Sequence, residues 1–204
     1  MHFSVLLTLV TAAAASPLSA RQATDPADLA PWKITSLFSY KPSSQPGPDK
    51  NSRISLRISD PNTIKLMRAS RFGFGVFSPL TSDCTISWPF PDGVPPFNEE
   101  VLCGVTGDDD GGAYGNFSVL LQPGTGGEDV LDFKVKLIER REVSILNHYF
   151  YRQFEGEADF KVGENYQGSC GDAGVCAGQL EGQLEVDQEI TQSVGSCEEY
   201  GGCT

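Results

Sequence analysis

The chain has 204 residues, with 15 Lys and Arg against 27 Asp and Glu, and a formal net charge of −12 at pH 7. This length is sufficient for one domain with a substantial hydrophobic core. The acidic balance disfavours nucleic acid as a partner, because phosphate backbones bind to basic surfaces.

Residues 1–20 have the features of a secretory signal peptide. Their short apolar core ends in small residues and Pro17, and we expect cleavage near Ala15 or Ala20. This core is too short to cross a bilayer, and no later segment reaches about 18 apolar residues, so no membrane span is expected. We therefore expect a secreted, extracellular protein. Residues 21–31 are polar, contain two prolines and are interpreted as a leader before the ordered domain.

Alternation of apolar and polar residues predicts a series of β-strands. Residues 53–59, RISLRIS, alternate strictly and place three aliphatic side chains on one face. Residues 130–138, VLDFKVKLI, alternate in the same way from Leu131 onward. In FGFGVF the glycines predict a strand whose backbone is closely approached on one side. Further strands are predicted at 32–40, 84–88, 116–122 and 154–162, and residues 178–190 are compatible with a strand or a short helix.

Segments rich in Pro, Gly, Ser and Asp separate these strands and predict loops or turns at 41–52, 60–63, 89–100, 107–115 and 123–129. No stretch sustains a helical period. We therefore predict one all-β domain at residues 32–190, an antiparallel sandwich or barrel stabilised by disulfides. Residues 191–204 form an acidic tail that contains two cysteines.

Charge is distributed unevenly along the predicted strands. Residues 32–71 carry eight basic residues against two acids, whereas residues 72–130 carry nine acids and no Lys or Arg. We expect basic and acidic strands to lie side by side and partly neutralise each other. Alternatively, the basic segment at residues 32–71 could present a binding face.

Six cysteines follow the signal peptide: Cys84, Cys103, Cys170, Cys176, Cys197 and Cys203. An even number in a secreted chain indicates disulfides, although six cysteines permit fifteen pairings. Local spacing suggests three bridges between successive cysteines, and the last pair could instead bond between chains. A zinc site is disfavoured because the spacing in CGDAGVC is too long and the mature chain has one histidine. A redox site is disfavoured as well, because it would need the spacing C-x-x-C before a helix.

His148 restricts the available catalytic chemistry. A Ser-His-Asp triad would have to use it, and no G-x-S-x-G motif is present. We expect His148 to be a half-buried strand residue, and we expect no cofactor and no metal. Residues 108–112, DDDGG, lack the spacing of a calcium loop and are interpreted as a solvated acidic loop. A hydrolase using two carboxylates remains an alternative, and it would show two close acids in a cleft, one with a raised pKa.

Two short motifs concern modification and processing. Asn116 begins the sequon Asn-Phe-Ser, which predicts a glycan if the side chain points outward. Arg140 and Arg141 are expected to end a strand on the solvent side, with a dibasic processing site as the alternative.

The proline-rich loop is a candidate binding element. It carries Trp88, Phe90 and Phe97, and a disulfide from Cys84 to Cys103 would bracket it. A stapled loop with aromatic residues can bind a partner with little loss of entropy. For Trp88 itself we favour packing in the core beside that disulfide, whereas Phe97 is compatible with either role.

Several segments in a fixed order suggest a family. They are a signal segment ending near SPLSARQ, WKITSLFSYKPSS, RISLRISDPNT, a C-x3-W motif before the proline-rich loop and a second cysteine, and DFKVKL followed by FKVGENYQGSCGDAGVC. Together they resemble small secreted cysteine-containing fungal proteins of the Alternaria major-allergen-like type, over residues 32–176. Residues 64–80 and the tail look like additions to that pattern. The dimer cysteine of that family has no counterpart here, so dimerisation is not carried over.

The resemblance implies a β-barrel or sandwich that is secreted, non-enzymatic and active as an allergen, elicitor or effector in virulence. We therefore expect a fungal binding protein whose partner is a host protein or a cell-wall glycan. The alternatives are the carboxylate hydrolase and an inhibitor of a host enzyme that inserts the proline-rich loop.

Overall fold

The computed structural model describes residues 22–23, 29–43, 50–70, 73–105, 115–126 and 130–195. The regular elements in these ranges are all β-strands, which confirms the all-β prediction. They are β1 (Gln22–Ala23), β2 (Trp32–Lys41), β3 (Asn51–Asp60), β4 (Thr63–Ser70), β5 (Gly73–Phe77), β6 (Leu80–Pro89), β7 (Glu100–Leu102), β8 (Gly104–Val105), β9 (Gly115–Pro123), β10 (Asp132–Ile145), β11 (His148–Lys161), β12 (Tyr166–Cys170), β13 (Cys176–Leu180), β14 (Leu184–Val186) and β15 (Glu189–Val194).

Some predictions fall on residues outside these ranges. They concern the signal peptide at residues 1–20, the acidic loop at 108–112, and Cys197 and Cys203 in the tail. In the part of the chain that the structure describes, no helix is long and apolar enough to cross a membrane.

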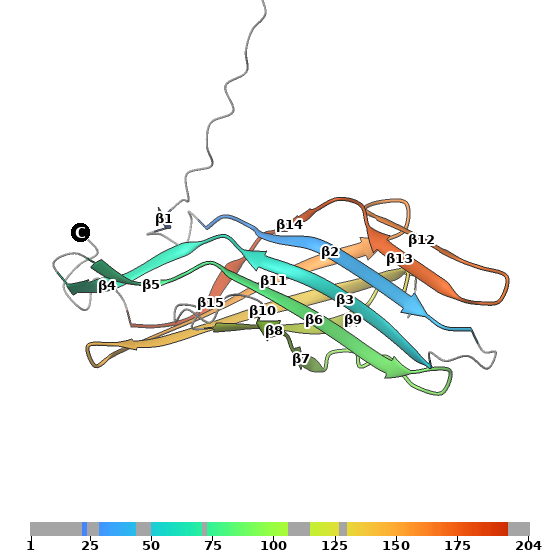
Figure 1. Ribbon diagram of the computed structural model, residues 1–204, viewed down its shortest axis with the longest axis horizontal. Helices are drawn as coiled ribbons and strands as arrows, with labels where there is room; N and C mark the ends of the chain where they lie inside the picture. The colour runs from blue at the N-terminus through green and yellow to red at the C-terminus, as the bar shows by residue number, and fades with distance from the viewer. Residues whose placement is uncertain are drawn as a thin grey trace, which may run out of the picture.

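Two antiparallel sheets form the body of the molecule (Figure 1). The larger sheet has the order β12-β13-β2-β3-β6-β8, with β14 also pairing with β2. The second sheet has the order β15-β11-β10-β9-β7. The sheets pack face to face as an open sandwich, so the predicted sandwich is confirmed and the barrel alternative is not.

The hydrophobic core lies between the two inner faces because both sheets alternate apolar and polar residues. On β3 the inward side chains of Ile54, Leu56 and Ile58 are at most 3% exposed, as the alternation predicts. On β10 the inward residues Phe133 and Val135 are at most 2% exposed. The alternating segments therefore form the core as expected.

The β4–β5 hairpin forms a small separate layer with β1. This layer covers the end of β10 and the start of β11. There Leu66, Met67 and Phe77 form a second apolar cluster with Phe150. A Cβ atom on Gly75 would lie 2.0 Å from Cδ1 of Ile145, so this glycine allows the close approach that its spacing predicted.

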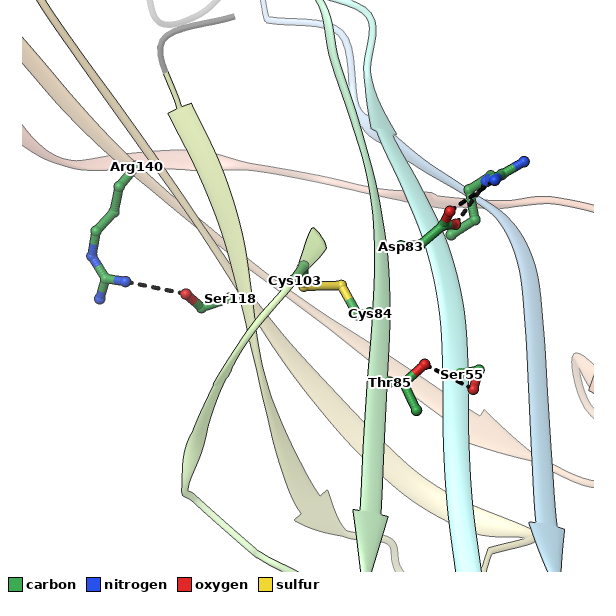
Figure 2. The surroundings of a disulfide bond; sticks show 8 residues. Ser55, Asp83, Cys84, Thr85, Cys103, Ser118 and Arg140 are labelled. Atoms are coloured by element: carbon green, nitrogen blue, oxygen red, sulfur yellow. Dashed lines mark hydrogen bonds and ion pairs between the residues drawn. A yellow bond between two sulfur atoms is a disulfide. The ribbon is translucent and has the colours of Figure 1, made fainter. Parts of the chain in front are cut away.

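The first disulfide lies where the chain crosses from one sheet to the other. Strand β7 pairs with β9 in the second sheet, β8 pairs with β6 in the larger sheet, and Cys103 lies between β7 and β8. The backbone N–H of Cys103 donates to the carbonyl of Phe117 at 2.9 Å, while its sulfur is bonded to Cys84 on β6 (Figure 2). This residue therefore joins both sheets along one edge of the sandwich.

The second disulfide, Cys170–Cys176, closes the β12–β13 hairpin, in which the two cysteines are cross-strand partners. Both disulfides agree with the pairing that local spacing suggested. The glycine-rich turn between Cys170 and Cys176 is therefore closed by a structural disulfide.

Two expectations about strand ends were wrong. Strand β10 does not end at Arg140 and Arg141: it continues to Ile145, and Arg141 is only 1% exposed. The strand continues because β10 and β11 pair along all 14 residues of each, and interior carboxyl groups compensate the charge of Arg141. Residues 178–190, which were compatible with a strand or a short helix, contribute to the strands β13, β14 and β15, and the predicted end of the domain at residue 190 falls inside β15. The last of these strands extends to Val194 and pairs with β11.

Candidate functional site

A cluster of polar side chains lies in the interior, between the sheets. Oε2 of Glu139 accepts a hydrogen bond from the indole Nε1–H of Trp32 at 3.0 Å, and Oε1 accepts one from Arg141. Arg141 also contacts Oδ2 of Asp60 at 3.3 Å. Burial and the nearby negative charge of Asp60 raise the pKa of Glu139 to about 8, while the guanidinium of Arg141 opposes this shift.

This cluster meets one requirement of a carboxylate hydrolase, a close pair of acids, but not the other, access for a substrate. Asp60 and Glu139 are close, and one has a raised pKa, which is the combination needed for general acid and base catalysis. However, Asp60, Glu139 and Arg141 are each at most 1% exposed. A substrate therefore has no access to these carboxyl groups, and their role is to pair with Arg141 inside the fold.

A second group of acids lies at the surface, around a cavity of about 360 Å³ lined by Glu155, Glu157, Asp187 and Glu189 with Lys136. Lys136 forms an ion pair of 2.6 Å with Glu155, and this hydrogen bond holds the pKa of that carboxyl below its usual value. Among the residues that the structure describes, no group of three or more His, Cys, Asp or Glu side chains is arranged to hold a metal ion.

The outer face of the larger sheet carries a different kind of site. Five side chains, which we call the cross-strand row, are direct partners across five adjacent strands. In register order they are Gln167 on β12, Gln179 on β13, Phe38 on β2, Ser55 on β3 and Thr85 on β6. Because directly opposed residues in antiparallel strands point to the same face, all five project outward.

Two adjoining grooves follow this row. One, of about 580 Å³, is lined by Phe38, Gln167 and Gln179, by other residues of β12 and β13, and by Val162, Gly163 and Glu181 beside these strands. The other, of about 490 Å³, continues across β2, β3 and β6 and includes Ser55 and Thr85. The grooves share Phe38 and Gln179, so they form one continuous surface. The Phe38 side chain, 40% exposed, lies at the centre.

The charged side chains that flank the row are already paired. The guanidinium of Arg57 donates two hydrogen bonds to the carboxylate of Asp83, at 2.7 and 2.8 Å. On the other side, Arg53 lies 5.0 Å from the centre of the Tyr40 ring. Figure 2 shows the Asp83 pairing on the same strands as Ser55 and Thr85, whose hydroxyl oxygens are 3.1 Å apart. The Arg57–Asp83 pair confirms that basic and acidic strands lie side by side.

The proline-rich loop presents different residues from those that the sequence suggested. Trp88 is 7% exposed and packs in the core with Cys84, which confirms the favoured interpretation of that residue. Phe90 is half-buried, and Phe97 is half-buried and packs against the core. Val94, at 75% exposure, is the large hydrophobic side chain that the loop presents to solvent, among polar and proline residues that are also exposed. No local pattern identifies it, because it is a single Val in a run of Gly and Pro.

This loop is anchored at both ends. The backbone N–H of Phe90 donates to the carbonyl of Lys50 at 2.8 Å, and the N–H of Asn98 donates to the carbonyl of Leu121 at 2.8 Å. A Cβ atom on Gly93 would lie 2.1 Å from the carbonyl oxygen of Pro89, so the turn requires glycine there. The loop therefore holds Val94 in a defined position.

The remaining candidates lie on the second sheet. His148 is half-buried at the start of β11, as expected. Asn116 is half-buried on β9, and its Oδ1 atom is buried, with no hydrogen-bond partner among the described residues. Glycosylation of Asn116 stays a prediction.

No protein-family model, no curated protein and no solved structure matches the chain. The resemblance to the Alternaria major-allergen-like proteins therefore stays a prediction, and the function is proposed from the surface geometry described above.

Proposed function

We propose that this chain is a secreted fungal binding protein of the effector or elicitor type, acting on a host protein or a cell-wall component. The observation that carries the proposal is the continuous grooved surface across five strands of the larger sheet. A surface built on a hydrogen-bonded sheet loses little backbone conformational entropy when a ligand binds, because its strands are already ordered.

The covalent structure supports an extracellular role. The disulfides Cys84–Cys103 and Cys170–Cys176 are consistent with a protein that functions in an oxidising compartment. The interior carboxyl groups of Asp60 and Glu139 are inaccessible to substrate, which favours binding over carboxylate-based hydrolysis.

The test uses the purified mature chain with intact disulfides, immobilised and exposed separately to plant apoplastic fluid and to washed cell-wall material. The same chain, reduced and alkylated, is the matched control. We expect saturable binding to one of the two fractions by the folded chain and none by the reduced chain. Absence of saturable binding in both fractions would reject the proposal.

A second candidate function, inhibition of a host extracellular enzyme, is favoured by the anchored position of Val94. Exposed at 75% on an ordered loop, this side chain could enter the cleft of an enzyme. Val94→Asp should abolish inhibition in a panel of apoplastic proteases and glycanases. Val194→Asp, at a valine on β15 that is 51% exposed, is the control and should leave inhibition unchanged.

A further inference from the structure

We infer that the cross-strand row binds a neutral polysaccharide chain, laid across the strands of the larger sheet. This inference rests on the proposed binding function and names the class of its ligand. It follows from three properties of the row: the hydrogen-bonding groups it presents, its lack of charge and its length.

The row can make both kinds of contact that a sugar ring needs: hydrogen bonds to its hydroxyl groups and apolar packing against its C–H face. Gln167 and Gln179 each present an amide with donors and an acceptor, and the hydroxyls of Ser55 and Thr85 donate and accept. A pyranose ring has hydroxyl groups around its edge that need such partners, and its C–H face is apolar. The exposed ring of Phe38 lies between the amides and the hydroxyls, where that apolar face can pack on it.

The charges that line the two grooves disfavour anionic ligands. None of its five members is ionisable. The charged residues that line the two grooves are Glu181 and Asp83, both acidic, and Asp83 is paired with Arg57. A phosphate-bearing or carboxylate-rich ligand would meet this negative charge, and none of the described residues that line the two grooves is a Lys or Arg. A neutral ligand rich in hydroxyl groups matches this surface.

The length of the row indicates a chain of sugars. With neighbouring strands about 4.8 Å apart, five strands place Gln167 and Thr85 about 19 Å from each other. The two grooves meet at Phe38, so a ligand that fills both must cross this residue. We therefore expect Phe38 to contribute most and longer oligosaccharides to bind more tightly than short ones.

The packing beneath the row fixes its shape. Gly168 and Gly178 are cross-strand partners whose missing side chains face the interior. A Cβ atom on Gly178 would lie 2.4 Å from the ring of Tyr166, and one on Gly168 would lie 2.7 Å from Leu131. The β12–β13 hairpin therefore lies directly on the core, and Tyr166 donates a hydrogen bond of 2.7 Å to Ser39 on β2.

The test measures sedimentation of the full mature chain with insoluble cellulose, chitin, xylan and β-1,3-glucan, and retardation in gels that contain soluble polygalacturonate. The variants are Phe38→Ala and Gln179→Ala. Tyr149→Ala is the matched control, because Tyr149 is an aromatic of similar exposure (45%) on β11 of the other sheet. Near-ultraviolet circular dichroism and a thiol assay verify that each variant is folded with its disulfides formed.

We expect the unaltered chain to bind at least one neutral polysaccharide and not polygalacturonate. Phe38→Ala should weaken that binding about tenfold or more, Gln179→Ala should weaken it less, and Tyr149→Ala should not change it. Absence of binding to all four neutral polysaccharides, or unchanged binding by folded Phe38→Ala, would overturn the inference. If the chain binds an apoplastic protein but no polysaccharide, the inference fails and the proposed function stands. If it binds neither, both fail.

Discussion

The indole N–H of Trp32 donates a 3.0 Å hydrogen bond to Glu139, which is 107 positions further along the chain. Trp32 belongs to β2 of the larger sheet and Glu139 to β10 of the second sheet, so this bond connects the two layers through the interior. Two carboxyl groups, Asp60 and Glu139, share the single guanidinium of Arg141 at this point. Burial is the main cause of the raised pKa of Glu139, and the negative charge of Asp60 adds to it.

This raised pKa predicts a pH dependence of stability. Glu139 has a pKa of about 8 in the folded chain against 4.5 for the free group. Between these values the folded state binds the proton and the unfolded state does not. The contribution to stability is therefore fully present below pH 4.5 and is lost as pH rises to about 8, at about 1.4 kcal/mol per pH unit.

The measurement is the free energy of unfolding in urea at pH 5.5, 7 and 8.5, for the unaltered chain and for Glu139→Gln. The variant lacks this titration, so its stability relative to the unaltered chain should improve as pH rises. Other titrating groups are common to both proteins and cancel in the difference. Parallel pH profiles would contradict the prediction.

Removal of the buried cation should be severe. Arg141→Met leaves Asp60 and Glu139 buried without their cation, so we expect a loss of about 3–5 kcal/mol in the free energy of unfolding. The control is Arg57→Met, which breaks an ion pair whose side chains are 52% and 44% exposed and should change the urea midpoint little. If both variants lost a similar free energy of unfolding, burial would not determine how much these ion pairs contribute to stability.

The two disulfides should contribute unequally. Cys84–Cys103 closes a separation of 19 residues and Cys170–Cys176 one of 6. Because a longer loop constrains the unfolded chain more, replacing the first pair by alanine should cost about 3 kcal/mol and the second about 2 kcal/mol. Guanidinium unfolding of the two double variants checks this order, and the reverse order would contradict it.

Gly178→Ala should destabilise the β12–β13 hairpin. The added Cβ atom would lie 2.4 Å from the Tyr166 ring, so the hairpin must move away from the core, at a cost of about 1–3 kcal/mol. Gly171→Ala is the matched control in the same hairpin, because the nearest atom to its Cβ would be 3.9 Å away. Thermal unfolding of both variants measures the difference. Equal melting temperatures would show that the interface with Tyr166 can adjust.

Local periodicity was sufficient to predict the strands that form the core. The alternation around Ile54 and Phe133 reports burial on one face, and the structure buries those residues. The local spacing of Cys84 and Cys103, and of Cys170 and Cys176, was sufficient for the two disulfides. Each of these signals is contained within a short stretch of the sequence, so it can be recognised without knowledge of distant contacts.

The rest depends on contacts between distant segments. Arg141 was expected at the surface because the fold that buries it is not visible locally: Glu139 is two positions away in sequence, but the second carboxyl group, on Asp60, is 81 positions away. The cross-strand row was not predicted for the same reason: Phe38 and Gln179 become neighbours only through the β2–β13 register. Strand alternation shows which face a residue occupies, but it does not show which residue of another strand lies beside it.

The cross-strand row also has an immunological consequence. At most two of its members, Gln167 and Gln179, lie within one hairpin, and the other three come from separate strands. An antibody directed at this face would recognise a conformational epitope. It would bind the folded chain in a native immunoassay and would lose that binding on a reducing, denaturing blot or after digestion to peptides.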